Sequence, residues 1–225
     1  MNRTLKALAN DIARKTKLAK GLIIPVSGGS DSALCFWLLN QVYPEKTLGV
    51  YAGSRENLRC ADWFHSNGTI QYVAHPLCEN KQEAEIFRWA EFLKIAVIEN
   101  RWLVGARNKT ESVFGTYSHA SCVATYLPLA RVWKTTVMEL CAACGVPQEI
   151  IASSSKADPA CGRPLELAEI PIEVIDGYLM EKIGGKLLPS VRLPDETQRL
   201  YLDGIYDYNR FKAKLPQLGA RIRPR

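Results

Sequence analysis

No stretch of the sequence is apolar for long, and histidine is scarce. No apolar run reaches the ~18 residues that a membrane-spanning helix needs, and the N-terminus lacks the basic, apolar and small-residue order of a signal peptide. The three histidines (His65, His75 and His119) are far apart, and no HExxH or paired CxxC motif is present. We therefore expect a soluble, cytoplasmic protein without a membrane partner or a histidine-based zinc site.

Cysteine is present, but not in a disulfide pattern. The seven cysteines are odd in number, scattered, and partly embedded in apolar runs. Such usage predicts reduced thiols in a cytoplasmic protein. Cys141 and Cys144 form a CxxC, yet both lie on the apolar side of an expected helix with Val137 and Leu140. Core packing is therefore expected for this pair ahead of a redox or metal role.

Length and composition predict one large domain covering residues 1–225. The chain is 47% hydrophobic, enough to bury a full core. Its formal net charge is +6, with three arginines in the last five residues. That balance fits a phosphorylated partner, and it fits a solvated basic surface equally well.

The first half of the chain alternates short apolar runs with helical patterns. Expected helices cover residues 4–19, 32–43, 57–66 and 80–100, expected strands cover 21–26, 47–53 and 69–75, and residues 101–106 form a further apolar run. This alternation predicts an α/β fold, a doubly wound parallel sheet flanked by helices. Residues 107–130 look loop-like. Later helices are expected at 132–145, 147–151, 171–182 and 195–213, with a lid or excursion at 186–208.

A Ser-Gly knot separates the first strand from the helix that follows it. This segment is Ser27-Gly28-Gly29-Ser30-Asp31-Ser32. It brings free amide N–H groups, hydroxyls and the positive end of a helix dipole to one point, so we expect an anion as its ligand. The glycines leave room for the backbone to wrap a phosphate. Asp31 would repel that phosphate unless a cation such as Mg²⁺ lay between them. The alternative is an ordinary strand-to-helix turn with a capping side chain, which binds no ligand.

The knot is neither a Walker A sequence nor a dinucleotide GxGxxG. It resembles the SGGxDS loop of the ATP pyrophosphatases, which cleave ATP into AMP and pyrophosphate. The resemblance implies an adenine nucleotide alpha hydrolase-like fold. It also implies an ATP site made by Ser27, Gly28, Gly29, Ser30, Asp31 and Ser32.

Downstream stretches narrow the resemblance to the ammonia-dependent NAD synthetases. "GARNKTE", residues 105–111, is similar to their GTxNKxE stretch, which implies that Glu111 joins Asp31 as a Mg²⁺ ligand. A helix-capping role is the alternative for Glu111. Arg88 and Lys134 fall on positions that contact the ATP phosphates in that family, and Asp31 and Lys134 are the implied catalytic residues.

The acceptor half departs from the family. Where its relatives carry acids that hold the nicotinate-bearing dinucleotide, residues 116–129 contain no acid. Lost hydrogen-bond partners change which substrate a pocket accepts. The implied acceptor-binding residues are Asn108, Lys109, Ser121, Cys122, Thr125, Lys156 and Asp158.

The resemblance implies an ATP-dependent amide-forming ligase. It would adenylate nicotinic acid adenine dinucleotide, release pyrophosphate, and let ammonia displace AMP to give NAD. Ammonia would be free or come from a separate glutaminase, and the protein would be a homodimer. Two alternatives stay open: the same adenylation on another carboxylate or a tRNA base, and a nucleotide-binding homologue without turnover. Otherwise we expect no nucleic-acid partner.

Overall fold

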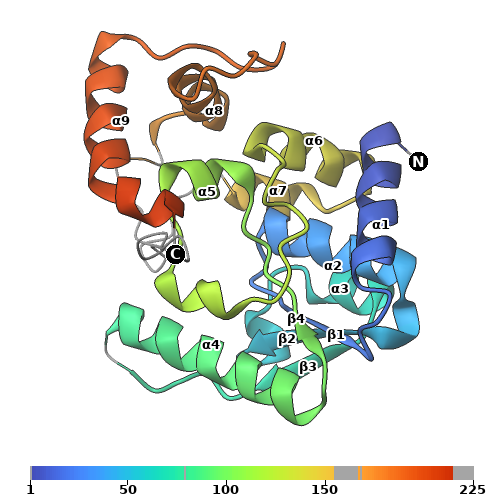
Figure 1. Ribbon diagram of the computed structural model, residues 1–225. Coiled ribbons are helices and arrows are strands. Elements are labelled where there is room, and N and C mark those ends of the chain that lie inside the picture. The colour runs from blue at the N-terminus through green and yellow to red at the C-terminus, as the bar shows by residue number, and fades with distance from the viewer. Residues whose placement is uncertain (1, 79, 155–166, 168, 215–225) are drawn as a thin grey trace, which may run out of the picture.

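The computed structural model describes residues 2–78, 80–154, 167 and 169–214 (Figure 1). Its centre is a sheet of four parallel strands in the order β3-β2-β1-β4. The strands are β1 (Leu22–Pro25), β2 (Thr47–Ala52), β3 (Ile70–Val73) and β4 (Trp102–Leu103). All the pairings are parallel, and the register aligns Leu22 with Thr47 and with Trp102. The predicted parallel α/β sheet is confirmed. The predicted acceptor-binding residues Lys156 and Asp158, and Cys161, lie outside the described residues.

Helices fill most of the remaining chain. They are α1 (Arg3–Lys15), α2 (Ser30–Val42), α3 (Ala61–Asn67), α4 (Lys81–Ile98), α5 (Lys109–Phe114), α6 (Lys134–Ala143), α7 (Gln148–Ser153), α8 (Ile172–Lys182) and α9 (Glu196–Asn209). Short 3₁₀ turns occur at η1 (Pro44–Lys46), η2 (Arg55–Asn57), η3 (His119–Val123) and η6 (Arg210–Lys214). The expected helices are confirmed, with bounds that shift by a few residues.

One expectation was wrong. Residues 107–130 were predicted as loop, but α5 forms inside them. Asn108 and Glu111 make a capping box, in which each side chain accepts a hydrogen bond from the other residue's backbone N–H. Two satisfied N-terminal donors stabilise a helix of only six residues.

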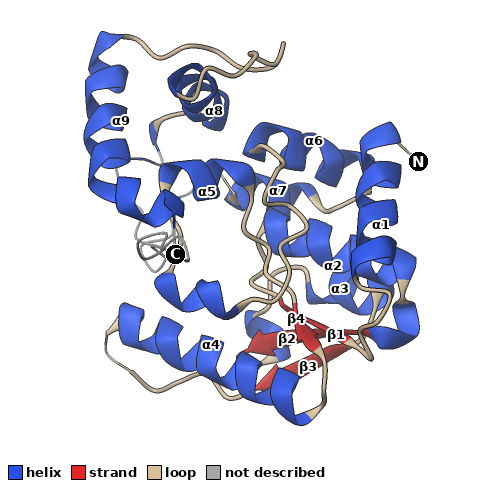
Figure 2. Cartoon of the chain, viewed as in Figure 1, coloured by secondary structure: helices blue, strands red, loops and turns tan. Residues whose placement is uncertain are grey.

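Helices cover both faces of the sheet (Figure 2). On one face, α2 packs with α1, α3, α6 and α7 around Leu22, Ile24 and Phe36. On the other face, α4 places Phe92 and Ile95 against strand residues such as Ile23. The central strand β1 lies between these two layers, so its sequence is apolar throughout rather than alternating, whereas the edge strand β3 has only Ile70 buried.

A third cluster joins α5, α8 and α9. Its buried members include Phe114, Tyr178 and Leu202. The chain before α9 runs along α8, where the Arg192 backbone N–H donates to the Glu173 carbonyl at 3.1 Å and the two side chains form an ion pair at 2.7 Å. The segment 186–208 therefore packs on this cluster, and a lid movement stays a prediction.

The strand order sets the position of a crevice. From β1 the chain moves to β2 and β3 on one side, and β4 returns to the other side of β1. The connections leaving β1 and β4 therefore diverge, which opens a crevice at the carboxyl ends of these strands. None of the described helices is both long enough and apolar enough to cross a membrane.

Close backbone packing between α8 and the segment before α9 makes a test of this arrangement. A Cβ added at Gly177 would lie 2.1 Å from the Arg192 carbonyl oxygen. We expect Gly177→Ala to lower the free energy of unfolding by about 1–3 kcal/mol, because the backbone must shift. Urea unfolding followed by circular dichroism measures it.

Gly204 on α9 is the matched control, since an added Cβ meets nothing within 4 Å. Gly204→Ala should be neutral or stabilising by about 0.5–1 kcal/mol. Equal unfolding midpoints for the two variants would contradict the packing described here.

Candidate active site

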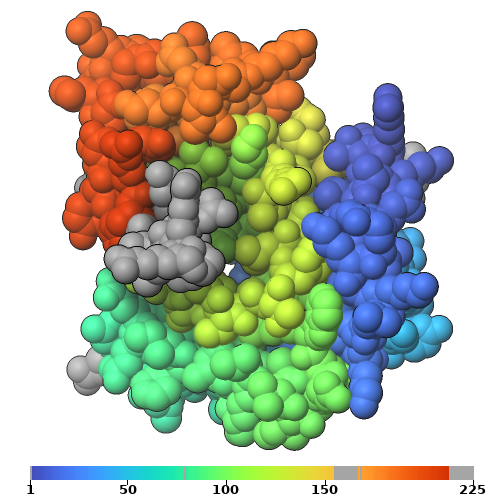
Figure 3. All heavy atoms as spheres, in the orientation of Figure 1, coloured from blue at the N-terminus to red at the C-terminus, as the bar shows by residue number. Residues whose placement is uncertain are grey.

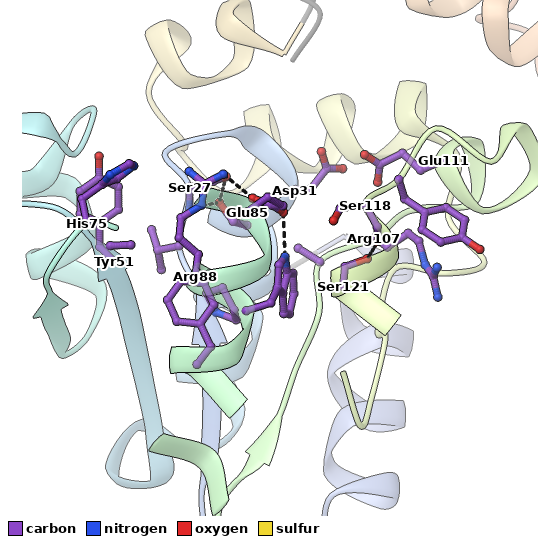
Figure 4. A pocket seen from close by; sticks show the side chains of 18 residues that line it. Ser27, Asp31, Tyr51, His75, Glu85, Arg88, Arg107, Glu111, Ser118 and Ser121 are labelled. Atoms are coloured by element: carbon purple, nitrogen blue, oxygen red, sulfur yellow. Dashed lines mark hydrogen bonds and ion pairs between the residues drawn. The ribbon is translucent and has the colours of Figure 1, made fainter. Parts of the chain in front are cut away.

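A pocket of about 340 Å³ opens at the carboxyl ends of the strands. It is bounded by the ends of β1 and β2, the start of α2, one side of α4, and the segment from the end of β4 to η3. In Figure 4, Tyr51 and His75 lie at one end, Ser27 and Asp31 lie in the middle, and Glu111 lies at the other end. This is the crevice that the strand order predicts.

The Ser-Gly knot forms the middle of the pocket. Gly28 has φ +75°, a left-handed conformation that favours glycine. The Ser27 backbone N–H donates to Ser32 Oγ at 3.1 Å, and Ser32 Oγ donates to the Gly29 carbonyl at 3.0 Å. Of the six knot residues that were predicted to bind ATP, Ser27, Asp31 and Ser32 line the pocket. These hydrogen bonds therefore fix the conformation of the knot at the start of α2, where it faces the pocket.

Ser30 points the other way. It is fully buried, and its hydroxyl accepts from the Lys134 ammonium at 2.7 Å and from the Ser154 hydroxyl at 2.5 Å. Lys134 is only 3% exposed and also pairs with the Asp31 carboxylate. Lys134 does not line the pocket, so it lies behind Asp31. Its predicted contact with ATP phosphates stays a prediction.

Asp31 is also tied to α5. The Asn108 side-chain amide donates to Asp31 Oδ1 at 2.9 Å, while Asn108 Oδ1 accepts from the Glu111 backbone N–H at 2.9 Å. Glu111 Oε2 accepts from the Asn108 backbone N–H at 3.1 Å. Glu111 therefore caps the helix and lines the same pocket as Asp31. Asn108 is fully buried and braces the two carboxylates rather than lining the pocket.

Asp176 on α8 stabilises this arrangement through hydrogen bonds to α5 and α6. Its carboxylate is fully buried and accepts from the Thr110 hydroxyl at 2.5 Å and from the Thr135 N–H and hydroxyl, both at 2.8 Å. Thr110 Oγ1 in turn accepts from the Lys134 N–H at 2.9 Å. Burial raises the pKa of Asp176, and these hydrogen bonds oppose the rise. Asp176 therefore fixes α5 and α6, which carry Glu111 and Lys134, against each other.

The opposite wall is α4. Arg88 lines the pocket as expected, but its guanidinium forms an ion pair with Glu85. The Trp89 indole N–H donates to the other Glu85 oxygen at 2.7 Å. Sequence reasoning missed Glu85 and Trp89, although both lie within one turn of Arg88 on a helix that had been identified.

Few of the predicted acceptor residues reach the pocket. Ser121 lines it, whereas Cys122 and Thr125 are exposed and do not line it. The Lys109 ammonium lies 4.3 Å from the centre of the Trp133 ring and is also absent from the lining. Arg107, Tyr117 and Ser118 do line it, and sequence reasoning missed them.

The two cysteines of the CxxC pack in the hydrophobic core: Cys141 is buried there, and Cys144 is partly buried against it. Burial raises the pKa of Cys141 to about 12 and that of Cys144 to about 11. The Cys141 thiol donates to the Ser30 carbonyl at 3.4 Å. Within the described part of the chain, no group of three or more His, Cys, Asp or Glu side chains is placed to hold a metal. The core-packing interpretation fits these observations.

Thiol alkylation tests that interpretation. At pH 8, a thiol with a pKa of about 12 is about one part in ten thousand thiolate, the reactive form. We expect iodoacetamide to label the exposed Cys122 well before Cys141 in the native protein, as read by peptide mass spectrometry. Denatured protein, in which all thiols react, is the control. Equal rates for Cys141 and Cys122 in the folded chain would refute the buried assignment.

Comparisons with known proteins agree with one another. The family model described as NAD synthase matches residues 77–216, more than half of the chain. The NH(3)-dependent NAD(+) synthetase of Carboxydothermus hydrogenoformans is 26% identical over 183 residues, covering 67% of this chain and 73% of that protein. The Wolinella succinogenes protein of the same name is 24% identical and covers 100% of this chain and 96% of its own length.

Solved structures show the same fold. An NH3-dependent NAD synthetase from Campylobacter jejuni superposes with a TM-score of 0.74 at 19% identity, covering 98% of this chain and 100% of that one. An NMN synthetase from Francisella tularensis also has a TM-score of 0.74, at 18% identity and 96% coverage of both chains. Because the family model, the full-length relative and the fold all point the same way, this chain belongs to the NAD synthase family.

Proposed function

We propose that this protein is an ammonia-dependent amide-forming ligase that converts nicotinic acid adenine dinucleotide to NAD at the expense of ATP. The observation that carries the proposal is the pocket itself. The Ser27–Ser32 knot opens into it at the start of α2, and two carboxylates, Asp31 and Glu111, line it from separate elements. Residues 1–225 would act as one catalytic domain.

The knot supplies what a triphosphate needs. The first amides of α2 lack helical partners and carry the positive end of the helix dipole. The hydroxyls of Ser27 and Ser32 stand beside them on the pocket wall. These donors would hold the phosphates with little rearrangement, which favours transfer chemistry at the α-phosphate. Arg88 would approach a phosphate by exchanging its Glu85 partner.

The donor set fits Mg²⁺. Mg²⁺ typically takes one or two carboxylates together with phosphate oxygens and water, so three protein ligands are not required. Asp31 and Glu111 would hold it, each with an oxygen that accepts from Asn108 in the structure. Bound there, the ion would neutralise phosphate charge and remove the conflict between Asp31 and an anion.

Two displacements make the amide. An oxygen of the acceptor carboxylate attacks the α-phosphorus of ATP, the bond to the β-phosphate oxygen breaks, and pyrophosphate leaves. Ammonia then attacks the carbonyl carbon of the acyl adenylate, AMP leaves with that oxygen, and a proton passes to solvent. The residues around the knot would act mainly by positioning the reactants and by stabilising charge.

Three further proposals complete this function. Ammonia would enter freely or from a separate glutaminase. The protein would act in the cytoplasm, in keeping with six free cysteines among the described residues. It would work as a homodimer, a state supported by Ile86, Val97 and Ile98 on α4, each more than half exposed.

A second candidate function keeps the adenylation and changes the acceptor. The observation that favours it is the acid-free segment 116–129, from which Tyr117, Ser118 and Ser121 line the pocket. The Francisella tularensis structure of the same fold is described as an NMN synthetase, so a smaller pyridine nucleotide is one such acceptor.

Turnover with the purified protein tests the proposal. With ATP, Mg²⁺, ammonia and nicotinic acid adenine dinucleotide, we expect NAD and AMP in equal amounts by chromatography. Asp31→Asn should lower the rate of NAD formation at least ~100-fold, because the variant loses the carboxylate that would hold Mg²⁺ against the ATP phosphates. Asp62→Asn, an exposed site whose ion pair with Arg55 does not line the pocket, should match the wild type.

Other outcomes separate the alternatives. Pyrophosphate release with another acceptor but not with this dinucleotide would favour the second candidate. ATP binding without AMP formation from any acceptor would leave only a nucleotide-binding homologue.

A further inference from the structure

Arg107 is a cation on the pocket wall that has no acidic partner among the described residues. We propose that Arg107, together with the Ser118 hydroxyl, forms a subsite that binds a phosphate group of the acceptor, so that the enzyme selects a nucleotide over its unphosphorylated riboside. The inference rests on the proposed function, because it concerns the molecule whose carboxylate is amidated. It adds a specificity-determining residue to that site.

The position of Arg107 is fixed from both directions. It directly precedes Asn108, whose side chain bonds Asp31 and caps α5. Its guanidinium carbon lies 4.0 Å from the centre of the Tyr117 ring. Tyr117 is itself buried, and its hydroxyl donates to the Lys212 carbonyl at 2.5 Å. The guanidinium therefore rests on a rigid aromatic platform, which reduces the entropy lost when it binds a ligand.

Arg107 hydrogen-bonds the Tyr117 side chain, but its hydrogen-bonding capacity is only partly used. Its Nε is buried and has no hydrogen-bond partner among the described residues. Its Nη1 has one weak contact, with the Cys122 sulfur at 4.0 Å. Arg88 in the same pocket is different, since Glu85 already neutralises it. Buried donors are normally satisfied, so the open donors of Arg107 point to a ligand.

The surroundings suit an anion. The Ser118 hydroxyl accepts from the Ala120 N–H at 3.2 Å, and among the described residues no acceptor is assigned to its hydrogen. Ser121 donates to the Ser118 carbonyl at 2.6 Å and holds this turn in place. Residues 112–138 contain no Asp or Glu, so this stretch adds no negative charge to repel a phosphate. Arginine and hydroxyl donors together are typical phosphate ligands.

The subsite is distinct from the place of reaction. The reacting carboxylate must meet the α-phosphate at the Ser27–Ser32 knot. In Figure 4, Arg107 extends away from Ser27 and Arg88, on the side of the pocket where Ser118 and Glu111 lie. One group cannot occupy both positions, so the anion at Arg107 is a second group of the acceptor. In a pyridine nucleotide that group is a phosphate.

Binding of three acceptors measured without ATP tests the subsite. The probes are nicotinic acid riboside, its mononucleotide and nicotinic acid adenine dinucleotide, titrated by calorimetry into the full chain. We expect the wild type to bind both nucleotides more tightly than the riboside. Arg107→Ala should weaken both nucleotides by about tenfold or more, the effect of losing a charge-assisted bond, and leave the riboside unchanged. Arg107→Lys, which keeps the charge but not the fork, should recover part of the loss.

Arg131→Ala is the matched control, because Arg131 is exposed and does not line the pocket. Unchanged ATP binding and unfolding temperature in each variant show that the fold is intact. Equal nucleotide affinities in Arg107→Ala and the wild type would overturn the proposal, as would equal weakening of the riboside or no binding of any probe. Amide formation by the wild type is read separately. Its failure with a persisting Arg107 effect would reject the proposed function and keep the subsite.

Discussion

The ion pair of Lys134 and Asp31 joins the elements on which the site depends. Lys134 comes from the start of α6, and it contacts both Ser30 and Asp31 in the first turn of α2. Lys134 is only 3% exposed, and a buried charge is stable only when it has such partners. Asp31 also accepts from Asn108, which brings α5 into the same network. The knot, the cap of α5 and the start of α6 are therefore held as one unit.

This network explains how a chain with little regular sheet can hold a defined pocket. Only two residues of β4 pair with β1, so the walls beyond the sheet need other support. Asp176 provides it from α8, by holding Thr110 and Thr135 at the starts of α5 and α6. The third helical cluster is thus linked to the site through a polar contact in the core. Figure 3 shows the outer surface of α8 and α9, in orange and red, next to the green and yellow middle part of the chain.

The sequence predicts the fold well because periodicity and turn chemistry are local signals. The Ser-Gly knot, the long α4 and the apolar strands are each recognisable within about twenty residues. Helix α5 was also readable, from an Asn followed three residues later by a Glu. Side-chain partners are different, because they depend on where distant elements meet. Lys134 and Asp31, which form an ion pair, are 103 residues apart in the sequence. The ion pair of Arg88 with Glu85 depends on the rotamers of two pocket residues.

The acceptor end was the hardest part to predict for the same reason. Alignment by motif pointed to Ser121, Cys122 and Thr125, but around the 3₁₀ turn η3 only Ser121 of these lines the pocket, together with Ser118. Arg107 occupies a variable position inside a recognised motif, so nothing in the motif marks it. Its significance depends on the Tyr117 platform and on the lack of Asp and Glu in residues 112–138.

The central claim is that the acceptor carboxylate is activated by transfer of AMP, and isotope tracing tests it most directly. With an acceptor whose carboxylate carries ¹⁸O, the account predicts one ¹⁸O atom in the phosphate of the AMP product and none in pyrophosphate. Label in pyrophosphate or in inorganic phosphate, or AMP released without label while amide forms, would contradict it.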